Sequence, residues 1–359
     1  MNLSVGIVGL ANVGKSTLFN ALLKRQVAGS ANYPFTTIEP NVGVVEVPDS
    51  RLAKLAEVIG KQLTVNSELK MPPIVPATVR FVDIAGLIKG AHKGEGLGNQ
   101  FLSHIREVDL IVFVVRDFSD PNVINIGSDP NEDLEVLKTE LLLKDLETID
   151  KRLGSREQGI GSDKENLDKA KGLVEKGKWL RDEMTDQEIE KIADLQLLSS
   201  KKTIVIVNSD EKDLIQSDTP SKESPLQGGI RICAKMEAEL AELSVNDQKQ
   251  YLKEVGIEES GLDKVINKAY EVLGLVSFYT AGEKEVRAWT IKKGSLAPAA
   301  AGVIHSDFER GFIAADMVDF DKFVEIGGWQ AARSKGFVKT IGKSEVIKEG
   351  MVVEFKFSL

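Results

Sequence analysis

The segment Gly9 to Ser16 reads GLANVGKS and constrains the fold more than any other stretch of the chain. It matches the pattern G-x-x-x-x-G-K-[ST], in which a glycine-rich loop turns its backbone N–H groups toward the phosphates of a nucleotide. The apolar run Leu3 to Val8 predicts a strand before the loop, and Thr17 to Lys24 predicts a helix after it. The helix directs its positive end at the same anion. We therefore predict an α/β domain whose nucleotide-binding residues include Asn12, Val13, Gly14, Lys15, Ser16 and Thr17.

Residues further along the chain are expected to complete a Mg²⁺–nucleotide site. Lys15 can reach the β- and γ-phosphates, and Ser16 can bind Mg²⁺ through its hydroxyl. Asp83-Ile84-Ala85-Gly86 follows the apolar strand Thr78 to Val82, which places a carboxylate near the metal and the Gly86 N–H near the γ-phosphate. Thr37, with Thr36 as the alternative, lies where a switch loop would close over Mg²⁺. The predicted metal ligands are Ser16, Thr37 and Asp83, and the predicted catalytic residues are Lys15, Thr37 and Gly86.

The loop that would read the base carries Asn208-Ser209-Asp210-Glu211, after the strand Thr203 to Val207. A guanine-reading loop has the pattern N-K-x-D, whose aspartate accepts two hydrogen bonds from guanine. Here serine replaces the lysine and Glu211 replaces the aspartate, so the penalty for adenine should largely disappear. Asn208 and Glu211 are the predicted contacts on this side, together with Cys233, Ala234 and Lys235 of a second base-side loop.

Composition excludes several classes of protein. The single cysteine, Cys233, rules out an internal disulfide and suits a reducing compartment, and the longest apolar runs are too short to span a bilayer. We expect a soluble cytoplasmic protein with no membrane partner and no readout of DNA sequence. The net charge of −9 is concentrated in residues 131–274, which hold 22 basic against 32 acidic residues, or −10. Contact between RNA and another face of the molecule is therefore not excluded.

Periodicity divides the remainder of the chain. Residues 131–199 show leucine and isoleucine at three- and four-residue steps and a capping box at Thr185 to Glu188, which predict two antiparallel helices. Their acidity favours a solvated arm inserted into the α/β domain over two helices packed flat on its core. Short β-type runs and glycine-bearing turns begin after Gly274. The predicted domains are a nucleotide-binding domain over 1–130 and 200–274, a helical arm over 131–199 and a C-terminal domain over 275–359.

These elements together resemble the Obg-like ATPase family, the YchF branch of the translation-factor-class P-loop proteins. The specific segments are ANVGKSTLFNAL, YPFTTIEPNVG, DIAGLIKGAHKGEGLGNQFL, the NSDE base loop, CAK, and EVRAWTIKKGSLAPAAAGVIHSDFERGFIAAD. The resemblance implies an Obg-type G domain with an inserted coiled-coil arm and a β-grasp-like TGS domain. It also implies preferential hydrolysis of ATP, association with ribosomes or ribosomal RNA, and roles in translation and stress responses.

The sequence departs from the family pattern at several positions. Ala11 replaces a proline, Phe113 replaces a frequent histidine, Met351 replaces a frequent acidic residue, and Asp210 adds a carboxylate to the base loop, which leaves nucleotide preference open. Leu87 follows D-x-x-G where small GTPases place the glutamine that orients water, so we expect slow intrinsic hydrolysis.

The cofactors and the function class follow with stated alternatives. Mg²⁺ is the expected cofactor, and Asn12 is a candidate ligand for K⁺, the alternative being a structural role in the loop. The favoured function is a regulatory ATPase; the alternatives are a GTPase of the same architecture and a non-catalytic ribosome-binding adaptor that nucleotide stabilises. Lys292, Lys293, Arg310, Arg333 and Lys335 could contact RNA phosphate, with a solvated surface as an equal alternative.

Overall fold

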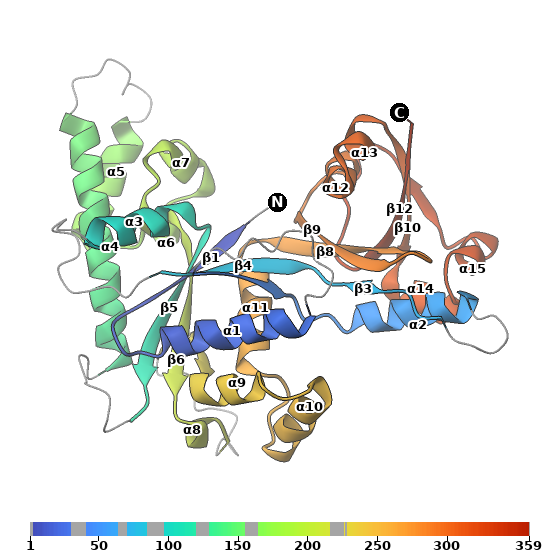
Figure 1. Cartoon of the computed structure of the whole chain (residues 1–359). Coiled ribbons are helices and arrows are strands. Elements are labelled where there is room, and N and C mark those ends of the chain that lie inside the picture. Colours follow the sequence, from blue (N-terminus) through green and yellow to red (C-terminus); the bar gives the residue numbers. More distant parts are fainter. Residues whose placement is uncertain are drawn as a thin grey trace. The chain divides into compact units, whose positions relative to one another are not determined.

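The computed structural model describes residues 3–29, 41–63, 70–84, 97–119, 129–154, 164–215, 226 and 228–358. Contacts divide the chain into two compact units (Figure 1). Leu3–Val45 and Arg80–Ala269 form one, here called the P-loop unit; Glu46–Val79 and Tyr270–Leu359 form most of the other, here called the C-terminal unit. Within the described ranges, no helix combines the length and the apolar character that a membrane span requires.

The P-loop unit is built on a six-stranded sheet in the order β2-β4-β1-β5-β6-β7. Its strands are β1 (Ser4–Gly9), β2 (Val42–Glu46), β4 (Thr78–Asp83), β5 (Leu110–Asp117), β6 (Lys202–Ser209) and β7 (Ile230–Ile232). The pairings of β1 with β4 and β5, and of β6 with β5 and β7, are parallel. Every residue of β1 and the run Leu110 to Val115 of β5 are buried, which explains why both strands read as continuous apolar runs.

Helices flank this sheet and connect its strands. They are α1 (Lys15–Gly29), α3 (Leu97–Glu107), α4 (Pro130–Gly154), α5 (Lys164–Glu175), α6 (Leu180–Glu183), α7 (Asp186–Glu190), α8 (Glu211–Ile215), α9 (Ala234–Leu240), α10 (Val245–Glu254) and α11 (Gly261–Val272), with 3₁₀ helices η2 (Ala193–Leu195) and η3 (Leu198–Ser200). The capping box predicted before α7 is confirmed: Thr185 N–H donates to Glu188 Oε2 at 2.8 Å, and Thr185 Oγ1 accepts from Glu188 N–H.

The acidic insertion is packed at its base instead of being solvated throughout. Helix α4 packs on β5 and η3, and α5 packs on α4. Asp145, fully buried, accepts hydrogen bonds from Leu198 N–H at 2.8 Å, Ser199 N–H at 2.7 Å and Ser199 Oγ–H at 2.5 Å. Trp179 covers Phe113 edge-on, with ring centroids 5.9 Å apart. The phenylalanine that replaces the family's frequent histidine is therefore a core residue, with no exposed surface.

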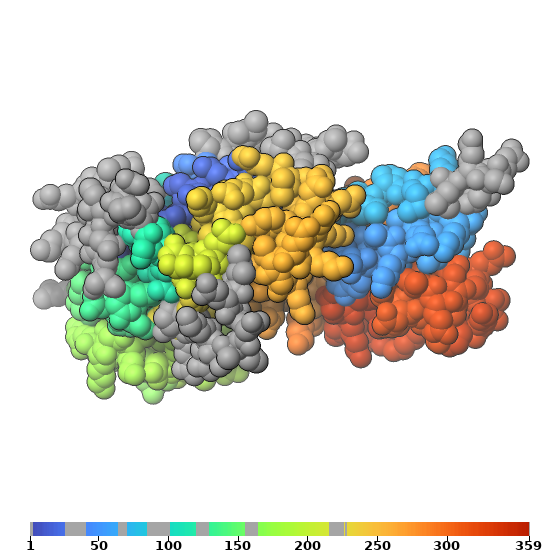
Figure 2. All heavy atoms as spheres, turned by 90° about the horizontal axis from the view of Figure 1, so that it is seen from below, coloured from blue at the N-terminus to red at the C-terminus, as the bar shows by residue number. Residues whose placement is uncertain are grey.

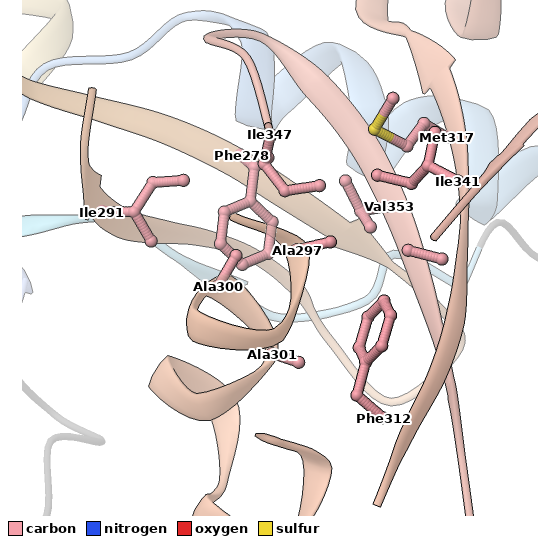
Figure 3. Packing of buried hydrophobic residues seen from close by; sticks show 11 residues of the cluster. Phe278, Ile291, Ala297, Ala300, Ala301, Phe312, Met317, Ile341, Ile347 and Val353 are labelled. Carbon is pink, nitrogen blue, oxygen red and sulfur yellow. The ribbon is translucent and has the colours of Figure 1, made fainter. Parts of the chain in front are cut away.

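The C-terminal unit contains a mixed six-stranded sheet in the order β11-β10-β12-β8-β9-β3. Its elements are α2 (Arg51–Leu63), β3 (Ile74–Val75), β8 (Leu275–Ala281), β9 (Val286–Lys292), α12 (Ala297–Ile304), α13 (Ser306–Arg310), β10 (Phe312–Asp319), α14 (Phe320–Ile326), α15 (Trp329–Ser334), β11 (Lys339–Ile341) and β12 (Met351–Phe357). The alanines Ala297, Ala300 and Ala301 present almost no bulk, so α12 can lie directly against Phe278 and Ile291 (Figure 3).

Residues 46–79 differ from the sequence-based division, which placed them in the nucleotide-binding domain. Their contacts lie in the C-terminal unit, because β3 extends its sheet beside β9 and Asp49 accepts a hydrogen bond from Tyr279. Arg51 adds a two-point ion pair to Asp49, at 2.8 and 3.0 Å, and a second ion pair to Glu349 at 2.7 Å. Local sequence patterns around residue 50 carry no sign of these distant partners.

Candidate nucleotide site

The phosphate-binding loop owes its shape to two residues in the left-handed region of backbone space. Asn12 has φ 63° and Gly14 has φ 93°, and α1 begins at Lys15 immediately after them. Asparagine tolerates this conformation better than most residues, and glycine adopts it without steric cost. Gly9 is required for a different reason: a Cβ there would lie 2.5 Å from the Val114 carbonyl oxygen of β5. The loop therefore leaves the sheet in close contact with its central strand.

Lys15 lies inside this loop, with only 8% of its surface exposed. Its ammonium donates a hydrogen bond to the Leu10 carbonyl at 2.5 Å, so the loop itself supplies an acceptor. Burial lowers the pKa of Lys15, and the negative charge of Asp83 at the end of β4 opposes that change. Burial raises the pKa of Asp83, and Lys15 opposes that change in turn. A cation and a carboxylate thus lie within electrostatic reach of each other at neighbouring strand ends.

Asn208 ties the phosphate loop to the loops on the base side. Its side chain is 5% exposed, its Nδ2 donates to the Val13 carbonyl at 2.9 Å, and its Oδ1 accepts from Ala234 N–H at 2.9 Å. Gly14 is the residue that makes room for it, because a Cβ at Gly14 would lie 2.3 Å from Asn208 Nδ2. The amide therefore brings together three segments that are far apart in sequence, and we call it the Asn208 cross-brace.

The base loop has its own internal contacts. Ser209 ends β6, is buried, and donates from its hydroxyl to Asp117 of β5 at 3.3 Å. Glu211 begins α8 and accepts a hydrogen bond from the Tyr251 hydroxyl at 2.9 Å. That bond raises the pKa of the Tyr251 phenol. One lone pair of Glu211 is therefore engaged by α10.

The second base-side loop begins α9. Cys233 is the buried residue before the helix, and burial raises the pKa of its thiol, which favours the protonated form. Ala234 is buried behind it and Lys235 is exposed. Helices α8, α9 and α10 lie together at the lower side of the unit in Figure 1, and Figure 2 shows the surface they form.

The structure thus brings together most of the predicted site residues. The others lie outside the residues that it describes. Asn12, Val13, Gly14, Lys15, Ser16 and Thr17 form the loop and helix start, Asp83 lies at the adjoining strand end, and Asn208, Ala234 and the loop are joined by hydrogen bonds. Thr37 and Gly86, together with Thr36 and Leu87, lie outside the described residues. The sequence reasoning did not anticipate Tyr251 and Asp117, since no motif marks either one.

Comparison with known proteins identifies the family. The chain is 45% identical to the ribosome-binding ATPase YchF of Bacillus subtilis and 42% identical to that of Escherichia coli O157:H7, over the full length of each protein and of this chain. The chain belongs to the YchF family. Residues 4–151 match the family described as 50S ribosome-binding GTPase, and residues 275–358 match the YchF GTPase C-terminal family, described as a protein of unknown function (DUF933).

A solved YchF structure agrees with the fold. The YchF GTPase of Schizosaccharomyces pombe superimposes with a TM-score of 0.84 at 35% sequence identity, covering 99% of this chain and 98% of that one. The P-loop fold with a C-terminal YchF domain is therefore shared across nearly the whole chain. Names within the family include both ATPase and GTPase, so the base-side contacts described above bear directly on nucleotide preference.

Proposed function

We propose that this YchF-family chain is a ribosome-binding ATPase whose bound nucleotide controls its association with the ribosome. The observation that carries the proposal of ATP is the base loop: serine occupies the lysine position, and the Glu211 carboxylate is engaged by Tyr251. A site without a free, well-placed acceptor pair gives guanine little advantage. The names of the bacterial relatives support ATP as nucleotide and the ribosome as partner.

Each residue of the phosphate site has a proposed role. The backbone N–H groups of the loop and the start of α1 bind phosphate oxygens, and Lys15 exchanges its bond to Leu10 for one to the phosphates. Exposed Ser16 and the half-buried Asp83 supply hard oxygen ligands, which suit Mg²⁺. When bound, Mg²⁺ offsets negative charge on the transferring phosphate. Thr37 and Gly86 are proposed to complete this site.

Hydrolysis is proposed to be slow without a partner, because Leu87 cannot orient water. The transition state would be stabilised by Lys15 and backbone N–H groups, and Asn12 remains the candidate K⁺ ligand. Turnover measured in KCl and in NaCl at equal ionic strength tests the cation: equal rates would remove Asn12 from that role.

Nucleotide preference is tested by the dissociation constants of the full chain for ATP and for GTP, each with Mg²⁺. We expect at least a tenfold preference for ATP, which corresponds to about 1.4 kcal/mol. Glu211→Asp shortens the side chain and breaks the bond to Tyr251, so it should improve GTP binding relative to ATP binding. The shift in relative affinity should not exceed about 1.5–3 kcal/mol, the contribution of a hydrogen bond to a charged group. Asp210→Asn tests the other carboxylate of the base loop, and its removal should leave the preference for ATP unchanged. A wild-type preference for GTP would overturn the ATP assignment.

Ribosome association distinguishes the regulatory ATPase from an adaptor. Lys15→Ala should weaken nucleotide binding and change cosedimentation with ribosomes if nucleotide controls binding. A folded Lys15→Ala protein that cosediments as the wild type does would favour the adaptor. In the C-terminal unit, Arg333 pairs with Glu354 and Arg310 with Asp307, which leaves Lys292, Lys293 and Lys335 as the better candidates for RNA phosphate.

A further inference from the structure

A cavity of about 290 Å³ lies between α3 and α4 in the P-loop unit. Its lining residues are Leu102, Ser103, Arg106, Lys144, Thr148 and Lys151, none of which belongs to the phosphate loop or the base loops. Ser103 and Lys151 are exposed, so the cavity opens to solvent. Leu102 is buried and forms an apolar part of its wall.

The lining is strongly cationic. Arg106, Lys144 and Lys151 contribute three positive charges, and none of the described lining residues is a carboxylate. Lys144 bonds Glu147 at 2.9 Å, which offsets one of the three. Among the described residues, Arg106 and Lys151 form no ion pair with any carboxylate. The buried Asp145 carboxylate lies within electrostatic reach of Arg106 and offsets part of its charge, but Lys151 adds a second cation from another helix. The cavity lining is therefore net positive, although the unit around it is acidic.

Hydrogen bonding within the cavity wall leaves donors unused. Arg106 Nη2 donates to Thr148 Oγ1 at 3.0 Å, and Thr148 Oγ1 donates to the Lys144 carbonyl at 3.0 Å, so the guanidinium is held against α4. Arg106 Nε is buried and has no acceptor in the part of the chain that the structure describes. Because Nε has almost no surface in contact with solvent, an anion in the cavity would meet the half-buried Arg106 through the terminal nitrogens of its guanidinium.

From this geometry we infer a second anion site, which binds a phosphate group between α3 and α4. The planar guanidinium matches phosphate oxygens, the two lysines add point charge, and the Ser103 hydroxyl supplies a neutral donor. The phosphate can be free or part of an RNA backbone, since both present the same oxygens. This site goes beyond the proposed nucleotide hydrolysis and does not depend on it.

The test uses the full chain saturated with ADP and Mg²⁺, so that the phosphate loop is occupied. One probe is inorganic phosphate, followed by ³¹P line broadening; the other is a labelled decauridylate with a 5′ hydroxyl, followed by fluorescence anisotropy. The variants are Arg106→Gln and Lys151→Gln. Lys176→Gln, an exposed lysine on the same insertion, is the matched control for loss of one charge.

We expect Arg106→Gln to weaken binding of at least one probe about tenfold or more, and Lys151→Gln to weaken it severalfold, since charge-assisted hydrogen bonds are lost. Lys176→Gln should bind both probes as the wild type does, and the affinity for ADP should be the same in all variants. Lys151 forms no ion pair with any residue that the structure describes, so its variant keeps the test valid if Arg106→Gln does not fold. Loss for phosphate alone would indicate a free phosphate, and loss for the oligonucleotide alone an RNA backbone. If both variants bind both probes as the control does, no site exists here.

Discussion

The Asn208 cross-brace should be a major source of stability for the nucleotide site. Asn208→Ala removes two buried hydrogen bonds of 2.9 Å and leaves the Val13 carbonyl and the Ala234 N–H without that partner. Each buried group left unsatisfied costs about 1–3 kcal/mol, so for the two groups we expect a loss of about 2–6 kcal/mol in the free energy of unfolding. Mg²⁺–ATP affinity should fall as well, because the loop is no longer held.

Gly14 gives an independent measure of the same contact. An alanine at this position meets Asn208 Nδ2 at 2.3 Å, whereas its next neighbour outside that amide is Ala234 Cβ at an ordinary 3.8 Å. Gly14→Ala should therefore combine backbone strain at φ 93° with a steric clash. In the double variant with Asn208→Ala the clash disappears and the strain stays. We expect the double variant to lose about 1–3 kcal/mol less free energy of unfolding than the sum of the two single variants.

Urea unfolding and Mg²⁺–ATP titration of the four proteins measure this coupling. Gly177→Ala controls for strain alone, because Gly177 has φ 71° and no described atom lies within 4 Å of the added Cβ. Asn267→Ala controls for loss of an exposed amide. Strictly additive losses, or a loss below about 1 kcal/mol for Asn208→Ala, would refute the cross-brace as an energetic link.

Two further predictions concern buried carboxyl groups. Burial raises the pKa of Asp145 to about 6, above its value in the unfolded chain, so the stability it contributes is complete below about pH 4 and is lost as pH rises through 6. Relative to Asp145→Asn, the wild type should lose up to about 3 kcal/mol between pH 4 and pH 7 in urea unfolding, and a constant difference would contradict this. Asp316 behaves oppositely: burial alone would raise its pKa, but Lys356 and Thr340 hold it below its usual range. Asp316→Asn should cost about 1–3 kcal/mol at pH 7 and remove part of the stability loss on acidification below pH 4, whereas equal acid profiles would refute the pairing.

The phosphate loop could be predicted from sequence because its requirements are local. Gly9 allows the close approach to β5, and Gly14 adopts the left-handed backbone conformation. Both glycines belong to one short motif. The strands β1 and β5 could be predicted equally well, since complete burial of a strand demands a continuous apolar run. The role of Asn208 was predicted only in part: its place near the base loop follows from the motif, but its two internal bonds depend on Val13 and Ala234.

The acidic insertion shows why composition failed where periodicity succeeded. The leucine pattern predicted the helices, and Leu137, Leu141 and Ile149 of α4 are fully buried. Counting carboxylates predicted a solvated arm, but Asp133 and Asp145 are also on the buried side of that helix. A charge count records how many carboxylates a segment has, whereas folding depends on which of them meet donors. Two of the three donors to Asp145 are backbone N–H groups, at Leu198 and Ser199, and the third is the Ser199 hydroxyl. All of them lie more than fifty residues from Asp145, and backbone groups leave no trace in a sequence. The bond between Tyr251 and Glu211 joins two side chains that are 40 residues apart, so no local pattern marks it either. The state of the Glu211 carboxylate, and with it the argument on nucleotide preference, therefore depends on the structure.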